Sequence, residues 1–91
     1  MEQTALYTTI KDVGFTVLVF EDHPGFFGNW RAHIKDGKCI YEIVSDSREG
    51  WLSLWRQENG NGQKLFESEL SRLGQSEELA LIKRWLEATK N

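Results

Sequence analysis

The dipeptide Asp36-Gly37 is the most constraining feature of this sequence, because apolar and polar residues alternate on both sides of it. A tight two-residue β-turn requires positive φ angles, which glycine and, less readily, aspartate adopt. We therefore expect a β-hairpin with Asp36-Gly37 as its loop and with Lys35 opposite Lys38. The register then decides which side chains share a face, because side chains alternate along a strand.

In this register the hairpin has one apolar face and one mixed face. The apolar face contains Trp30, Ala32, Ile34, Cys39, Tyr41 and Ile43. The mixed face contains Arg31, His33, Ile40 and Glu42. Arg31 then lies opposite Glu42, which makes a favourable cross-strand ion pair. A slip of one residue would mix the two sets, so the turn and the face pattern support one another.

A third strand is expected over residues 51–57, which follow the polar segment 45–50. If all six residues of that segment form the loop, the leucines of the strand join the apolar face and Trp51 and Trp55 join the mixed face. If the loop has five residues, the tryptophans turn inward and the leucines turn outward. The sequence leaves both alternatives open.

The N-terminal third predicts a helix and another strand. Residues 2–12 have roughly helical apolar spacing that ends at Gly14, with an extended ALYTTI segment as the alternative. Residues 15–22 are rich in β-branched and aromatic residues, which indicates a strand. Both faces of this strand are apolar, so we expect it to lie centrally in the sheet or under two layers. The following loop contains Phe26 and Phe27, and we expect at least one of them to pack against the edge of the core.

The C-terminal third predicts one or two helices. The two Asn-Gly steps in residues 58–63 either turn a fourth strand back over 64–67 or form a loop before a helix. We favour a helix over 64–73, because its apolar residues recur at helical spacing. The last helix begins with Ser76 as N-cap. Its apolar stripe contains Leu79, Ile82, Trp85 and Leu86.

Together these elements predict a single α+β domain over residues 1–91. Its core is an antiparallel β-meander of three to four strands, with a short N-terminal helix and one or two C-terminal helices packed on one face. A chain of 91 residues is long enough for one modest core. Because so few helices cover only one face of a sheet, the other face is left for solvent, for pairing or for binding.

Composition and charge narrow the classes of function. A single cysteine excludes an internal disulfide and a cysteine-based zinc site, and it suits a reducing cytoplasm. The net charge of −3 argues against nucleic-acid binding, which needs a basic surface. Apolar runs such as 17–20 are far shorter than the about 20 residues of a membrane helix, and the N-terminus lacks a secretory signal pattern. We therefore expect a cytoplasmic protein with neither a nucleic-acid nor a membrane partner.

No catalytic, cofactor or metal site is expected. His23, His33 and Cys39 are the only soft ligands, and their spacing matches no metal motif. The hairpin register places Cys39 and His33 on opposite faces, so they cannot form a nucleophilic pair. The carboxylates are dispersed rather than paired in a cleft, which disfavours acid–base catalysis. We therefore expect a protein that is not an enzyme.

The remaining prediction is a protein-interaction domain: an adaptor, a chaperone-like factor or an inhibitor of the toxin-immunity type. Its expected partner-binding residues are Arg31, His33, Ile40, Glu42, Trp51 and Trp55. Tryptophan and arginine are enriched at interface hot spots, whereas core packing is the default explanation for Trp51 and Trp55 in a small domain. The acidic charge is compatible with a basic protein partner.

Two other functions stay open at the level of sequence. The chain can be a structural module in which two copies pair through the uncovered face. It can also be a small-ligand binder, with a pocket between the sheet and the C-terminal helix lined by Trp30, Tyr41 and Trp85.

Overall fold

The computed structural model describes residues 2–23, 29–58, 60–70 and 73–90. Within these residues the elements are α1 (Gln3–Asp12), β1 (Thr16–His23), β2 (Asn29–Asp36), β3 (Cys39–Asp46), β4 (Trp51–Glu58), β5 (Asn61–Glu69) and α2 (Gln75–Thr89). The predicted α+β class is confirmed. The sheet has one strand more than the three to four expected, and one helix follows it.

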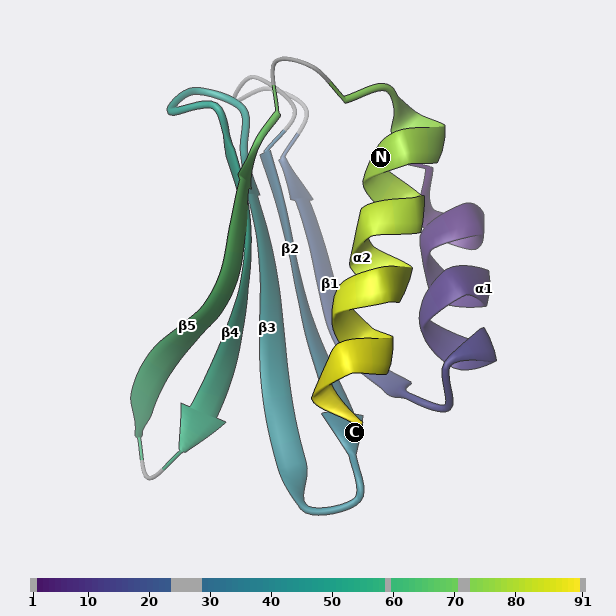
Figure 1. The fold of residues 1–91 in the computed structure, drawn as a ribbon, viewed down its shortest axis with the longest axis vertical. Coiled ribbons are helices and arrows are strands. Elements are labelled where there is room, and N and C mark those ends of the chain that lie inside the picture. Colours follow the sequence, from purple (N-terminus) through teal and green to yellow (C-terminus); the bar gives the residue numbers. More distant parts are fainter. Residues whose placement is uncertain (1, 24–28, 59, 71–72, 91) are drawn as a thin grey trace.

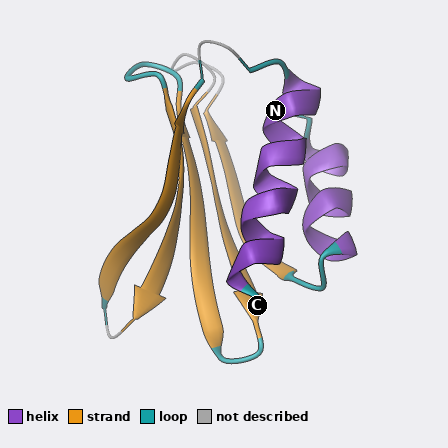
Figure 2. Cartoon of the chain, in the orientation of Figure 1, coloured by secondary structure: helices purple, strands orange, loops and turns teal. Residues whose placement is uncertain are grey.

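The five strands form one antiparallel meander in the order β1-β2-β3-β4-β5, so each strand pairs with its neighbour in sequence. Both helices pack side by side against the same face of this sheet (Figure 1). The opposite face carries neither of them (Figure 2). We call this uncovered surface the open face.

The core lies between the helices and the sheet. Its buried side chains are Leu6, Ile10, Phe15, Trp30, Ala32, Ile34, Tyr41, Ile43, Leu52, Leu54, Ile82, Trp85 and Leu86. Trp85 of α2 stacks on Phe66 of β5, with ring centroids 5.6 Å apart and an interplanar angle of 10°. The predicted apolar stripe of the last helix is therefore the surface that joins the two layers.

The β2–β3 hairpin forms, but its predicted register is wrong at the turn. Asp36 pairs with Cys39, so Gly37 and Lys38 make the two-residue loop instead of Asp36-Gly37. Gly37 takes the first loop position with φ +60°, where both primed turn types require a positive angle. Glycine adopts that angle more readily than aspartate. The partner strand is displaced by two residues, and an even displacement leaves the two faces unchanged.

The loop between β3 and β4 is shorter than either predicted length. Asp46 pairs with Trp51, which leaves a loop of residues 47–50. The side chain and the carbonyl of Asp46 accept the backbone N–H groups of Glu49 at 3.0 Å and Gly50 at 2.7 Å. The pairing of β4 with β3 is therefore displaced by two residues from that of the six-residue alternative, and an even displacement keeps the faces unchanged. Leu52 is therefore buried and Trp51 lies on the open face, as that alternative predicted.

The strand β1 is an edge strand, which corrects the expectation that it lies centrally or under two layers. A bulge occurs between Val17 and Val19. Val17 is opposite Ile34 on the core face, whereas Val19 is opposite His33 on the open face. The extra residue, Leu18, and Val19 are 46% and 45% exposed. The apolar character of both faces thus reflects an irregular edge rather than two covering layers.

The predicted helix over 64–73 is wrong, because this part of the chain contains β5. Phe66 pairs with Leu54 and reaches the core, where it meets Trp85. After the strand, the N–H of Leu70 donates to the carbonyl of Gly50 at 2.9 Å. Pairing with β4 outweighs the local helical spacing, as tertiary context often does. The alternative in which an Asn-Gly step turns a fourth strand back matches the structure better.

The ends of the two helices follow common capping rules. The helix α1 ends before Gly14, whose φ of +92° marks the predicted C′ position. The helix α2 has Gly74, not Ser76, as N-cap, and the Gly74 N–H donates to the Glu77 carboxylate at 3.1 Å.

The predicted packing of Phe26 and Phe27 falls outside the described residues. No helix in the described part of the chain combines the length and apolar character that crossing a membrane requires.

Candidate functional site

The open face is organised in rows of side chains that neighbour one another across the strands. One row contains Val19, His33, Glu42, Trp55 and Lys64. The next row contains Glu21, Arg31, Val44, Ser53 and Glu67. The predicted partner-binding residues Ile40 and Trp51 lie one row to either side, opposite Lys35 and Asp46. The structure thus brings all six predicted residues together on this face.

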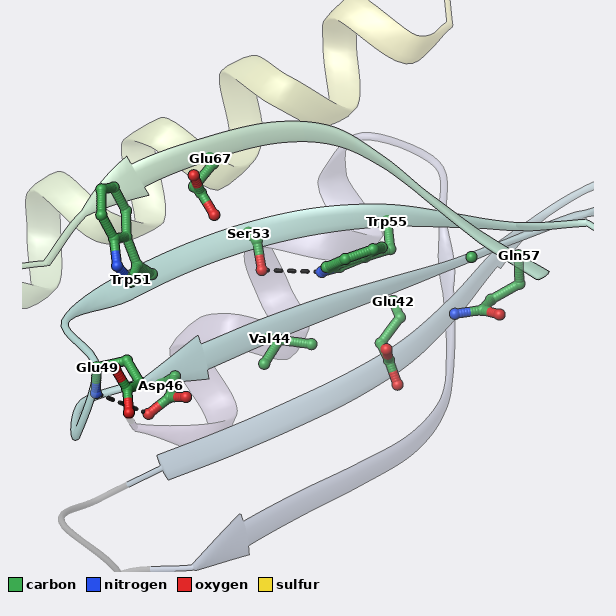
Figure 3. A pocket seen from close by; sticks show the side chains of 10 residues that line it. Glu42, Val44, Asp46, Glu49, Trp51, Ser53, Trp55, Gln57 and Glu67 are labelled. Carbon is green, nitrogen blue, oxygen red and sulfur yellow. Dashed lines mark hydrogen bonds between the residues drawn. The ribbon is translucent and has the colours of Figure 1, made fainter.

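A hollow of about 570 Å³ lies over β3, β4 and β5 on this face (Figure 3). Its lining residues are Glu42, Val44, Asp46, Glu49, Trp51, Ser53, Trp55, Gln57, Gly62 and Glu67. Trp51 and Trp55 both project from β4 into the hollow, with Ser53 between them, and Gln57 lies beyond Trp55. Residues four apart on a strand are separated by about 13 Å, so the two indoles start from well-separated positions along the hollow.

Trp55 is held in place from two sides. Its indole N–H donates to the hydroxyl of Ser53 at 2.9 Å, within the same strand. The ammonium group of Lys64 lies 5.3 Å from the centroid of the ring. Fixing the ring before binding reduces the side-chain entropy that a partner would otherwise have to remove.

Trp51 is the more accessible indole. It is 40% exposed at the start of β4, and Ile40 on β3 is exposed to the same extent. The exposed part of the indole leaves apolar surface in contact with water, which a partner would cover. The predicted alternative in which Trp51 packs in the core is therefore wrong. Trp55 is half-buried, and its ring also lies on the open face.

The hollow has an acidic lining, and part of that charge is neutralised. Glu42 faces His33, with Nε2 and Oε2 2.6 Å apart, and Arg31, whose Nε is 3.9 Å from the same oxygen. Glu67 pairs with Lys64 at 2.6 Å. The predicted pairing of Arg31 with Glu42 is therefore present as a diagonal contact, because His33 occupies the position opposite Glu42.

The other two carboxylates of the lining, Asp46 and Glu49, have no ion pair among the described residues. Asp46 Oδ1 accepts one backbone N–H, and no described residue donates to its second oxygen. Both residues lie beside Trp51 at the β3–β4 turn (Figure 3). Two carboxylates without an ion pair among the described residues and the exposed indole therefore coincide at this end of the hollow.

Sequence reasoning did not assign several of the lining residues. The expected helix over 64–73 does not place Glu67 on the sheet, and its pairing with Ser53 follows only from the strand β5. Asp46 and Glu49 were placed in a long loop, whereas the short turn carries them to the rim. The Asn-Gly step before β5 was the one signal for the fifth strand.

The remaining soft ligands do not form a site. Cys39 is half-buried against the core, with its Sγ 3.9 Å from the guanidinium of Arg56, and His33 lies on the open face. No group of three metal-ligating side chains is present in the described ranges. Trp30, Tyr41 and Trp85 are packed in the core.

Fold and site together define a two-layer α+β protein whose uncovered sheet face carries a hollow of tryptophan and carboxylate side chains. Comparisons with protein-family models, with curated proteins and with solved structures gave no match. The function is therefore argued from the chain's own residues.

Proposed function

We propose that this chain is a protein-interaction domain that binds another protein through the open face of its sheet. The observation that supports this most strongly is the pair of tryptophans that flank a hollow on a face left uncovered by both helices. Tryptophan is among the residues most enriched at interface hot spots. In this role the chain acts by binding, as an adaptor, a chaperone-like factor or a toxin-immunity-type inhibitor, and not as an enzyme.

The distribution of exposed apolar side chains supports the same surface. Among the described residues, the exposed large hydrophobic side chains are Leu18, Val19, Ile40 and Trp51. All four lie on strands, and none lies on the outer surface of α1 or α2. A sheet face exposed only to water usually carries polar side chains, so its apolar content favours a covering partner.

Charge favours a basic partner over a second copy of the chain. The chain has a net charge of −3, and four carboxylates line the hollow. Face-to-face pairing of two copies would bring two acidic hollows together, which like-charge repulsion disfavours. A different protein with a basic surface would instead gain from electrostatic complementarity. The single cysteine fits a reducing compartment, and we propose the cytoplasm as the place of action.

The small-ligand alternative has less support. The three residues expected to line its pocket are buried in the core, where Trp85 stacks on Phe66. A ligand between the sheet and α2 would have to displace these packed side chains, and close-packed interiors resist such insertion.

Site-specific photo-crosslinking in cells of the source organism tests the proposal. A photoreactive amino acid replaces Ile40 on the open face or, as the matched control, the exposed Lys83 on the outer surface of α2. We expect a discrete adduct with another protein from position 40 and none from position 83. Adducts from position 83 alone would contradict the proposal, and an adduct of twice the chain's mass would identify a second copy as the partner.

A further inference from the structure

Building on the proposed function, which supplies the partner protein, we propose that the hollow between Trp51 and Trp55 receives an arginine side chain of that partner. The volume of about 570 Å³ lies within the range of about 300–1,000 Å³ that ligand sites occupy. It is therefore large enough for a long side chain together with part of its neighbours.

The first argument is charge complementarity. Four of the ten lining residues are carboxylates, and no lysine, arginine or histidine is among them. The basic side chains nearest to Glu42 and Glu67 belong to this chain, since Arg31 and His33 face Glu42 and Lys64 faces Glu67. Asp46 and Glu49 have no such counter-ion in the described part of the chain. A cation from outside would supply the missing positive charge.

The second argument is the aromatic surface. Indole faces attract cations, and they do so more strongly than other aromatic rings. The chain itself shows this at Trp55, where the Lys64 ammonium lies 5.3 Å from the ring centroid. Trp51 has no comparable cation among the described residues, although it is the more exposed indole. The uncovered ring and the uncompensated carboxylates lie at the same end of the hollow.

The third argument selects arginine over lysine. A guanidinium is planar, so it can stack on an indole face while its edge donates two parallel hydrogen bonds to a carboxylate. Trp51 offers the face, and the free oxygen of Asp46 together with the exposed Glu49 carboxylate offers the acceptors (Figure 3). An ammonium group is a compact charge and cannot make both interactions in this way. The hollow therefore presents both an indole face and carboxylate acceptors, which a guanidinium contacts at the same time.

An NMR titration of the isotope-labelled chain tests this inference. The probe is N-acetyl-arginine amide, and the control ligand is N-acetyl-citrulline amide, which has nearly the same shape without the charge. We expect arginine to shift the Trp51 indole resonance and the amides of Val44 and Ser53 in a saturable manner. Citrulline should leave them in place, and added salt should weaken the arginine response.

Matched variants test the residues. Asp46→Asn/Glu49→Gln removes the two uncompensated charges and should weaken arginine binding by about tenfold. Asp12→Asn/Glu58→Gln makes the same change in net charge outside the lining and should leave binding unchanged. The Asn side chain keeps the oxygen that accepts the Glu49 N–H. The single variant Glu49→Gln, at an exposed position, gives the same test with the turn intact.

Three results would overturn the inference: equal shifts with citrulline, equal weakening in the control double variant, or no response of Trp51 to arginine. The proposed function has a separate outcome. If the crosslink from position 40 forms while arginine produces no shift, the open face binds a protein and the arginine assignment is wrong. If neither the crosslink from position 40 nor the arginine-induced shift is seen, both proposals are wrong.

Discussion

At the scale of single residues, tryptophans on the core face and on the open face of the sheet lie in opposite environments. Trp30 and Trp85 are 2% and 7% exposed and form part of the core, whereas Trp51 is 40% exposed. A core tryptophan contributes to stability through buried area and close packing. An exposed indole contributes little to stability, so its presence is better explained by what it contacts outside the chain.

This contrast predicts the stability of substitution variants. Trp51→Ser should lower the free energy of unfolding by about 1–2 kcal/mol, because part of the indole remains in contact with water. Trp85→Ala should lower it by about 3–5 kcal/mol, because it empties a packed site beside Phe66. Urea unfolding of the two variants measures both values. A loss at Trp51 as large as that at Trp85 would show that Trp51 is a core residue.

Glu78 gives a second prediction at this scale, in the dependence of stability on pH. Burial raises the pKa of this carboxyl above 4.5, and the polar groups of Trp30 and Ser45 offset only part of the effect. Its buried Oε1 has no hydrogen-bond partner in the described structure. Between the unfolded and the folded pKa the native state binds more protons than the unfolded state, so stability falls as pH rises through this window.

Glu78→Gln should therefore raise the Tm at neutral pH, because the variant carries no buried charge. The difference from the parent chain should shrink as the pH falls below 4.5, where Glu78 is neutral in both states. Thermal unfolding over a pH series measures this. A variant that is less stable than the parent at neutral pH would contradict the account of Glu78.

At the scale of elements, the β2–β3 turn depends on one glycine. Gly37 has φ +60°, and a Cβ added there would meet no atom within 4 Å. Only backbone strain therefore opposes a side chain at this position. Gly37→Ala should lower the free energy of unfolding by about 1 kcal/mol, whereas Lys35→Ala should change it by less than about 0.5 kcal/mol. Equal effects would show that the turn does not need a positive φ at Gly37.

The sequence determined the two faces of the sheet better than the pairing of its strands. The predicted register near Gly37 and the six-residue alternative near Gly50 were each displaced by two residues, an even number, whereas the five-residue alternative would have turned the tryptophans inward. Because side chains alternate with period two, the apolar and mixed sets stayed on their own faces. This is why the six predicted residues of the site share one surface.

The errors in the elements have a common physical origin. Apolar residues such as Phe66 and Leu70 have helical spacing, but the spacing does not report that β4 offers a free edge with which to pair. In β1, a bulge at Leu18 changes which side chains face the core, and a bulge has no distinct residue pattern here. Both features depend on the neighbouring strand, so local sequence cannot predict them. The acidic side of the hollow was missed for the same reason.

At the scale of the whole molecule, two helices cover one face of a five-stranded sheet and leave the other open (Figure 2). The acidic open face disfavours pairing of two copies, so we predict a monomer of 10.6 kDa. Sedimentation velocity over a wide concentration range checks this mass. A dimer that dissociates when Trp51 is replaced by Ser would instead support self-pairing through the open face.

The most direct test of the central claim is the crosslink from position 40 in a chain that carries Trp51→Ser and Trp55→Ser. We predict that the adduct with the partner disappears while the cooperative unfolding transition remains. Trp55→Ser alone should weaken it, because the ring anchored on Ser53 is lost. An undiminished adduct in the folded double variant would contradict the claim that the open face binds its partner through these two tryptophans.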